Sequence, residues 1–129
     1  MRATFTPATT MITLYGIKNC DTVQRALKHL SDEGIAHQFH DFKTQGLSAE
    51  LAQRWIDALG VDVVVNRKGT TWRKLDEATR ENLSAANAAA LLAREPSLVK
   101  RPVIDHDGRL SVGFAKADED AIVARLRSA

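Results

Sequence analysis

A short strand pattern that passes directly into a helix pattern, at residues 11–34, constrains the fold of this chain more than any other segment. The residues Met11–Tyr15 are mostly apolar, β-branched or aromatic, and Gly16 ends them in a turn. Apolar residues then recur at helical spacing, at Val23, Ala26, Leu27 and Leu30. Gly34 marks the end of this helix. With a second strand to follow, the segment predicts a β-α-β unit with parallel strands and a right-handed crossover.

The rest of the chain continues in strand and helix patterns. Strands are predicted at residues 37–42, 102–105 and 109–113. Helices are predicted at residues 48–60, about 75–82, 84–96 and 116–127. Ser48 and Ser84 are the expected N-caps of two of them, and Pro96 ends the second because proline cannot continue the helical hydrogen bonds. Asp107-Gly108 is a favoured hairpin turn.

The resulting order is β-α-β, then a helical stretch, then β-β-α. This is the order of elements in the thioredoxin fold, so we predict the α/β class and a thioredoxin-like fold with a helical insertion. One segment is ambiguous, because the polar stretch at residues 66–71 favours a loop. The residues before it favour a strand by propensity, since they include Val61, Val63, Val64 and Val65.

A chain of 129 residues fits one compact domain. Residues 1–10 have no periodic apolar pattern, so we expect a flexible N-terminal extension there and the folded domain at residues 11–129, with Met1 and Met11 both open as the start. No run of about 18 apolar residues is present, so we predict no contact with a membrane. The net charge of +2 is too small to predict a direct nucleic-acid partner.

Cys20 is the single cysteine of the chain, which excludes an internal disulfide, a CxxC pair and a multi-cysteine zinc site. The 4 histidines lack the spacing of metal ligands, so we predict no metal site. The absence of an export signal and of a cysteine partner favours the reducing cytoplasm as the compartment.

Cys20 lies in the loop between the first predicted strand and helix, where Asp21 or Thr22 is expected to cap the helix. Free N–H groups and the dipole at a helix N-terminus stabilise a thiolate, and Lys18 adds positive charge nearby. The alternative is a buried, unreactive thiol, which is a common state of free cysteine.

Three basic residues are further candidates. The bond Arg101-Pro102 opens a predicted strand and is either an ordinary trans bond or a cis bond, which would hold the Arg101 backbone beside the Cys20 loop. Arg67 and Arg73 lie in or beside the polar stretch. They either face an oxyanion or belong to a solvated basic loop.

Four stretches agree in order and spacing with a known family: YGIKNCDT at Tyr15–Thr22, NRKGTTWRKL at Asn66–Leu75, VKRPV at Val99–Val103 and VGF at Val112–Phe114. Together they resemble the arsenate reductase-like (ArsC/Spx/MgsR) family, and in particular its YffB branch. The resemblance covers residues 11 to about 127. It implies a thioredoxin-like domain with a helical insertion at about residues 48–95, a bend or short helix in the valine run, and a cis bond at Arg101-Pro102.

In the arsenate reductases of this family, a thiolate attacks arsenate while three arginines hold the oxyanion. The resemblance implies that Cys20 is the nucleophile and that Arg67 and Arg101 match the first two arginines. The position of the third arginine falls in Ser111–Gly113, where this chain has none, and Arg109 lies too early in its strand to replace that arginine. The loss of one guanidinium weakens the binding of a tetrahedral dianion, which disfavours arsenate as the substrate.

The chemistry that remains is thiol exchange between Cys20 and a small-molecule or protein disulfide. No second cysteine can resolve the mixed disulfide, so an external thiol, from glutathione or a glutaredoxin-like donor, is required. We therefore predict a glutathione-dependent thiol reductase, with no bound cofactor and with glutathione as co-substrate. Its expected substrate- and glutathione-binding residues are Lys18, Asn19, Arg67, Arg101 and Pro102, with Arg73 as a further candidate.

The alternative is a redox-sensing regulator of the Spx type, which binds the α C-terminal domain of RNA polymerase. Many such relatives carry a CxxC pair, whereas Val23 stands three residues after Cys20 in this chain. A third hypothesis is a binding protein without catalysis. A monomer is the default expectation for this fold.

Overall fold

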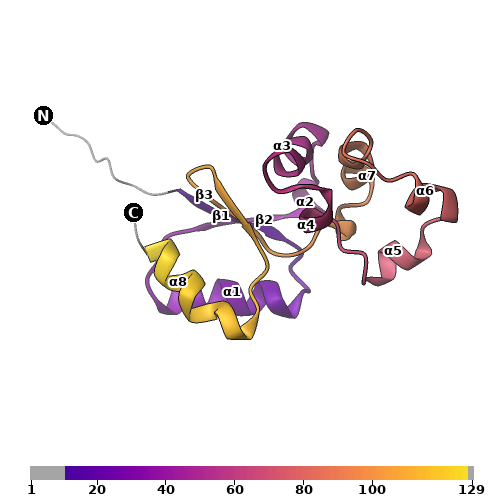
Figure 1. The fold of residues 1–129 in the computed structure, drawn as a ribbon. Helices are drawn as coiled ribbons and strands as arrows, with labels where there is room; N and C mark the ends of the chain where they lie inside the picture. The colour runs from indigo at the N-terminus through magenta and orange to yellow at the C-terminus, as the bar shows by residue number, and fades with distance from the viewer. Residues whose placement is uncertain (1–10, 128–129) are drawn as a thin grey trace, which may run out of the picture.

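A four-stranded sheet forms the centre of the computed structural model, which describes residues 11–127 (Figure 1). The strands lie in the order β2-β1-β3-β4. β1 and β2 are parallel, whereas β3 is antiparallel to both β1 and β4. The bounds are β1 Ile12–Gly16, β2 Gln38–Asp41, β3 Val103–His106 and β4 Arg109–Val112.

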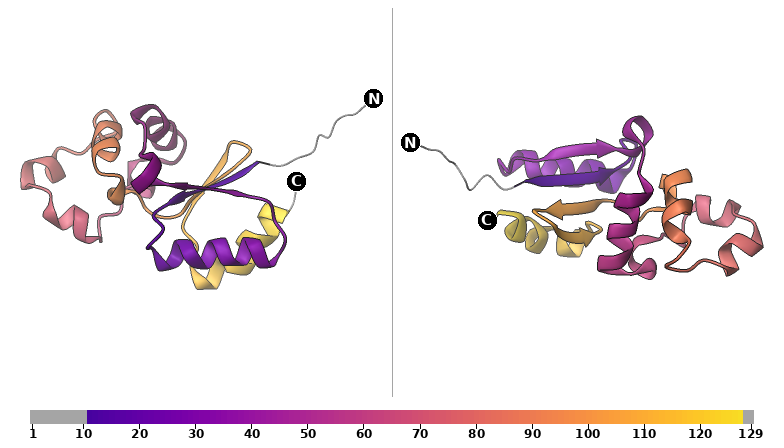
Figure 2. Two further views of the ribbon diagram at one scale, coloured as in Figure 1. Left: turned by 180° about the vertical axis from the view of Figure 1, so that it is seen from behind. Right: turned by 90° about the horizontal axis from the view of Figure 1, so that it is seen from above.

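Helices α1 (Asp21–Asp32) and α8 (Glu119–Arg127) cover one face of this sheet (Figures 1 and 2). The strands and helices share one buried apolar cluster, made of Ile12, Leu14, Ala26, Leu30, Ile104, Phe114, Ile122, Val123 and Leu126. Arg25 of α1 fastens the two helices together, because its guanidinium pairs with Glu119 and also donates to the carbonyl of Phe114. The position of α1 is therefore fixed by its packing on the sheet and by the contacts of Arg25 with α8 and Phe114.

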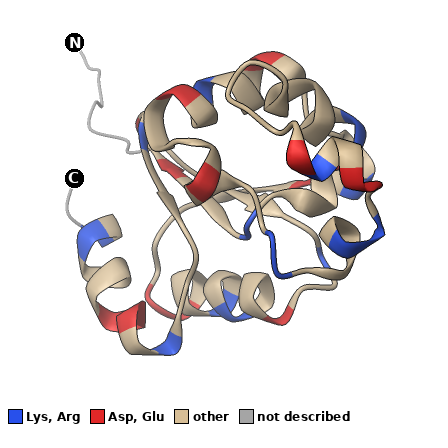
Figure 3. Ribbon diagram, turned by 45° about the vertical axis from the view of Figure 1, so that its right-hand side comes forward, with Lys and Arg blue, Asp and Glu red and all other residues tan. Residues whose placement is uncertain are grey.

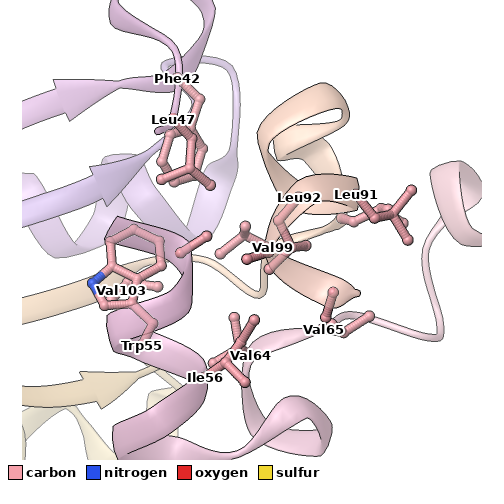
Figure 4. Close-up of a cluster of buried hydrophobic side chains, with 14 of the residues drawn as sticks. Phe42, Leu47, Trp55, Ile56, Val64, Val65, Leu91, Leu92, Val99 and Val103 are labelled. Atoms are coloured by element: carbon pink, nitrogen blue, oxygen red, sulfur yellow. The ribbon is translucent and has the colours of Figure 1, made fainter. Parts of the chain in front are cut away.

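A second group of helices lies between β2 and β3 in sequence and gathers beyond one end of the sheet (Figure 2). Helices α3 and α7 pack against each other, and their apolar residues form a second buried cluster with Val64 and Val99 (Figure 4). The bounds are α2 Phe42–Gln45, α3 Ala49–Leu59, α4 Val61–Val64, α5 Thr70–Lys74, α6 Glu77–Glu81 and α7 Ala88–Arg94. The 3₁₀ turns η2 (Pro96–Leu98) and η3 (Lys116–Asp118) precede β3 and α8.

The valine run is a short helix, α4, as the family resemblance implies and against its β propensity. Gly60 has a φ of 90° and ends α3, and its carbonyl accepts the amides of Val63 and Val64 at 3.2 Å each. The helical turn buries Val64, and Val65 after it forms an isolated antiparallel bridge with Val99. Burial of these side chains in the second cluster thus overrides the local preference for a strand.

Two expectations about helix caps are wrong, whereas one predicted loop and one predicted helix are present with shifted bounds. Neither Asp21 nor Thr22 caps α1, because Cys20 itself occupies the N-cap position. Ser84 lies in a turn before α7, where its Oγ accepts the amide of Ala86, so the helix begins only after Asn87. The polar stretch predicted as a loop enters helix α5 at Thr70, and the predicted helix at 75–82 is the shorter α6.

Three other predictions, on a cis bond, a hairpin turn and an N-cap, are confirmed. The Arg101-Pro102 bond is cis. Asp107 and Gly108 both have positive φ, at 53° and 89°, as a type I′ hairpin turn requires. Ser48 caps α3 by accepting the Leu51 amide at 3.1 Å. None of the helices in residues 11–127 is long and apolar enough to cross a membrane. The extension predicted at residues 1–10 lies outside the described residues.

Candidate active site

Cys20 takes the N-cap position of α1 with an extended backbone, at φ −91° and ψ 124°. Its amide donates to the Ile17 carbonyl at 3.1 Å, and its carbonyl accepts the Gln24 amide at 2.9 Å. The Gln24 side chain also donates to the Lys18 carbonyl at 2.6 Å, which closes the loop over the helix start. No side chain within residues 11–127 caps the helix, so the amides of the first turn stay unpaired next to the residue that carries the half-buried thiol, where an anion is favoured.

The close contact between β1 and α1 positions this loop. Gly16 is the last residue of β1, and a Cβ built on it would lie 2.7 Å from Cγ2 of Val23, which is fully buried. A side chain at residue 16 would therefore separate the strand from the helix. Glycine at this position lets the helix start next to the end of the strand, with Cys20 between them.

Two adjoining cavities meet at Cys20, with volumes of about 270 and 320 Å³. Asn66 and Arg101 line both of them together with Cys20. Lys43 adds positive charge to the first cavity and Lys100 adds it to the second. The first cavity is also lined by polar groups and one ring, from Asn19, Thr70, Thr71, Ser97 and Trp72. No Asp or Glu of residues 11–127 lines either cavity.

Arg101 is held in place by its neighbours in the chain. The amide of Lys100 donates to the Val64 carbonyl at 2.8 Å, and the cis bond to the buried Pro102 follows. The guanidinium of Arg101 donates through Nη1 to the Ser97 carbonyl at 2.9 Å. Its Nε is buried without a hydrogen-bond partner among the described residues, and the residue lines both cavities.

The other arginines from the sequence analysis lie apart from Cys20. Arg67 pairs with Asp62 at 2.7 Å and its guanidinium carbon lies 5.6 Å from the ring centre of Trp72. Arg73 donates to the Lys68 carbonyl at 3.0 Å, which ties down its own loop. Neither residue lines the two cavities.

The structure thus brings Cys20, Asn19 and Arg101 together, with Pro102 directly behind Arg101. The side chain of Lys18 is exposed and lines neither cavity, although its carbonyl helps to hold the loop. Basic and acidic residues are interspersed along the ribbon in the view of Figure 3. The acid-free wall around Cys20 therefore differs from its surroundings.

Sequence reasoning missed several polar groups in the cavities, among them Lys43, Asn66 and Lys100. The signal for Lys43 was present, because it follows β2 and the carboxyl ends of β1 and β2 lie at one edge of the parallel pair. The position of Asn66 at the cavity depends on a contact distant in sequence, since its backbone amide donates to the Leu98 carbonyl at 2.7 Å. No local pattern indicates that contact.

The fold and the site together define a class: a thioredoxin-like domain with one cysteine at the start of its first helix and a helical insertion that completes the pocket. A sequence model of the ArsC family matches residues 15–122. The chain belongs to the ArsC family.

Solved structures and a curated relative agree with this assignment. A YffB protein superimposes with a TM-score of 0.80 and 43% identity, over 87% of this chain and 98% of that one. An arsenate reductase (ArsC) related protein from Brucella melitensis has a TM-score of 0.73 and 46% identity, over 90% and 97% of the two chains. The global transcriptional regulator Spx of Streptococcus mutans is 28% identical over 118 residues, which cover 90% of this chain and 83% of the regulator.

Proposed function

We propose that this protein is a glutathione-dependent thiol/disulfide reductase in which Cys20 is the nucleophile. One observation carries the proposal: a single half-buried thiol lies at an uncapped helix N-terminus, between two cavities whose charged side chains are all basic. Membership of the ArsC family supports thiol-based oxidoreductase chemistry.

The proposed reaction has two exchange steps. The Cys20 thiolate attacks the glutathione sulfur of a mixed disulfide, the S–S bond breaks, and the substrate thiolate leaves and takes up a proton. A second glutathione, as thiolate, then attacks the sulfur bound to Cys20, which releases glutathione disulfide and restores the Cys20 thiolate. Over both steps, the mixed disulfide and one glutathione thiol give the substrate thiol and glutathione disulfide, and no bound cofactor is needed.

The basic side chains suit the charge of glutathione, which carries two carboxylates and one ammonium group. In this proposal the guanidinium of Arg101, which lines both cavities, binds one carboxylate beside the thiol, where an ionised acceptor makes a stronger hydrogen bond than a neutral one. Lys43 and Lys100 attract the rest of the anion, one in each cavity. Asn19 contributes polar lining, whereas Arg67 joins only if it leaves Asp62.

The proposal extends to the setting of the reaction. A nucleophile without a resolving cysteine depends on a glutathione pool, so we propose the reducing cytoplasm as the compartment. A glutaredoxin-like protein is the second candidate thiol donor. We propose a monomer, since the reaction requires one thiol and one pocket.

The test is a coupled assay of glutathione disulfide release from a mixed disulfide of glutathione and a small thiol. Cys20→Ser should abolish turnover without changing the fold. Arg101→Gln should lower kcat/KM by about tenfold, the equivalent of one charge-assisted hydrogen bond. Arg94→Gln is the matched control, because Arg94 is exposed and lines neither cavity at Cys20, and it should retain full activity. Turnover by the wild type no faster than the uncatalysed exchange would contradict the proposal.

The likeness to Spx favours a second candidate, a redox regulator that binds the α C-terminal domain of RNA polymerase. Val23 stands where a CxxC pair would have its second cysteine, so any such regulator would sense oxidants through Cys20 alone. A pull-down with the purified polymerase domain, before and after oxidation of the protein with diamide, tests this. Binding that changes with oxidation supports the regulator, whereas no binding in either state excludes it.

A further inference from the structure

A third cavity, of about 160 Å³, lies between the β3–β4 hairpin and the C-terminal half of α8. Its polar lining comes from all three elements, and it consists of His106, Arg109, Ser111 and Arg125. Apolar atoms of Ile104, Leu110 and Leu126 complete the wall. This cavity shares no lining residue with the two cavities at Cys20. β3 runs away from Arg101 toward His106, so the cavity lies at the opposite end of the sheet from Cys20.

No carboxylate within residues 11–127 forms an ion pair with the two arginines of this cavity. Arg125 donates through Nη2 to the hydroxyl of Ser111 at 3.0 Å, which is a neutral partner. The side chain of Arg109 makes no hydrogen bond or ion pair to another residue within 11–127, although its backbone pairs with β3. Elsewhere in α8, Glu119 binds Arg25 and Arg127 binds Glu33. Two guanidinium groups therefore share one cavity that no Asp or Glu of the described residues lines.

His106 supplies an independent observation. It is the one polar residue that is fully buried in the part of the chain described, with 4% of its surface exposed. Its Nε2 has no hydrogen-bond partner there. Buried polar atoms are almost always paired in folded proteins, so an unpaired ring nitrogen in a residue that lines a cavity indicates a missing partner. A histidine ring can donate to an anion once it is protonated or in the matching tautomer.

We infer that this cavity binds a phosphate group, either as free phosphate or as the end of a small phosphomonoester. The guanidinium fork matches the geometry of phosphate oxygens, and two of them balance a dianion. The hydroxyl of Ser111 and the ring of His106 add donors from the strands. The volume is several times the roughly 30 Å³ of one water, which fits a phosphate but not a large ligand.

Such a ligand would connect the edge of the sheet to the last helix. Arg109 and Ser111 belong to β4, the edge strand, and Arg125 belongs to α8. A dianion between them would replace the repulsion of the two guanidiniums with hydrogen bonds to both elements. Binding to the folded state alone also stabilises that state in proportion to ligand concentration. The site does not depend on the reaction at Cys20.

The test is a titration of the ¹⁵N-labelled full chain with inorganic phosphate at constant ionic strength, followed by NMR. Saturable shifts are expected in the amides of residues 106–111 and in the C-terminal turns of α8. Arg125→Gln and Arg109→Gln should each weaken binding by about tenfold, which corresponds to 1.4 kcal/mol. Arg94→Gln is again the control, since this exposed arginine lies outside the cavity. A parallel arm with glycerol 3-phosphate distinguishes a phosphomonoester from free phosphate as the preferred source.

Two results would overturn the inference. One is the absence of saturable shifts at residues 106–111 with either ligand. The other is a set of shifts confined to the Cys20 loop and residues 100–102, which would assign the phosphate to the first site. The arginine variants should keep the glutathione-dependent activity of the wild type, so a failure of the proposed reductase function and a failure of this site are separate outcomes.

Discussion

The contact between Gly16 and Val23 gives the sharpest prediction for how this fold positions its thiol. The change is Gly16→Ala. The added methyl group would lie 2.7 Å from Cγ2 of Val23, well inside the ordinary carbon–carbon contact of about 3.5–4.0 Å. Val23 has no exposed surface, and a β-branched residue in a helix has one strongly preferred rotamer, so its side chain cannot turn away cheaply.

The expected cost follows from these distances. Overpacking of a tight core costs about 1–3 kcal/mol, and we expect Gly16→Ala to lower the free energy of unfolding by that amount. Val23→Ala alone removes two buried carbons, worth about 1.6 kcal/mol at ~0.8 kcal/mol each, and also leaves a cavity. In the double variant the new methyl group occupies part of that cavity. The combined loss should therefore be smaller than the sum of the two by about 1 kcal/mol or more.

The measurement is urea unfolding followed by tryptophan fluorescence, since Trp55 is buried. The rate of Cys20 alkylation is measured in parallel, because displacement of α1 moves the loop that holds the thiol. Leu30→Ala is the matched control for the cycle: Leu30 is buried in the same helix but is not among the atoms near the built Cβ. Its effect should add to that of Gly16→Ala within about 0.5 kcal/mol. Additivity in the Gly16–Val23 pair as well would refute the reasoning.

Three further predictions concern groups outside the Cys20 site. Tyr15 is the single tyrosine, and its pKa is raised mainly by burial and further by the Asp105 carboxylate. Its ultraviolet titration should therefore have a midpoint above about 10, and Asp105→Asn should lower that midpoint. Stability should fall as the pH rises through that range, because the unfolded chain loses this proton first. The hydrogen bond from Arg25 lowers the pKa of Glu119, so the stability that this carboxylate provides above about pH 4.5 should be lost as the pH falls. The midpoint of urea unfolding should follow this loss in the wild type and change less with pH in Glu119→Gln. Ser48→Ala removes the N-cap of α3 and should cost about 1 kcal/mol in urea unfolding, whereas Ser48→Asp should cost much less.

The parts of the fold that were predictable from sequence are those set by local patterns. The strand before Gly16, the helix after it and the Asp107-Gly108 hairpin each follow from periodicity or turn chemistry within a few residues. The valine run shows the limit of propensity, because burial of Val64 and Val65 in the second cluster decides its conformation. Only the family resemblance indicated the short helix there.

The candidate site was predictable in part for the same reason. Cys20 is conspicuous as the single cysteine in a strand-to-helix loop, and Arg101 stands next to a proline at a strand start. The pairing of Arg67 with Asp62 and the arrival of Lys43 at the first cavity are tertiary facts. They depend on how the short helices α2 and α4 turn the chain, and the sequence patterns did not specify those turns.

The backbone pairing at the base of the helical insertion has a consequence for how this chain can vary. Val65 bridges to Val99, the Asn66 amide donates to the Leu98 carbonyl, and the Lys100 amide donates to the Val64 carbonyl. The helical insertion between these residues therefore begins and ends at one backbone-paired base, formed by residues 64–66 and 98–100. Asn66 and Arg101, which line the cavity at the thiol, lie at this paired base and not within the inserted helices. Because loop closure costs grow only slowly with length, the stretch around α6, which lines neither cavity at Cys20, can be lengthened, shortened or replaced while this backbone pairing is kept. The stretch around α6 is therefore a suitable place to insert a foreign loop.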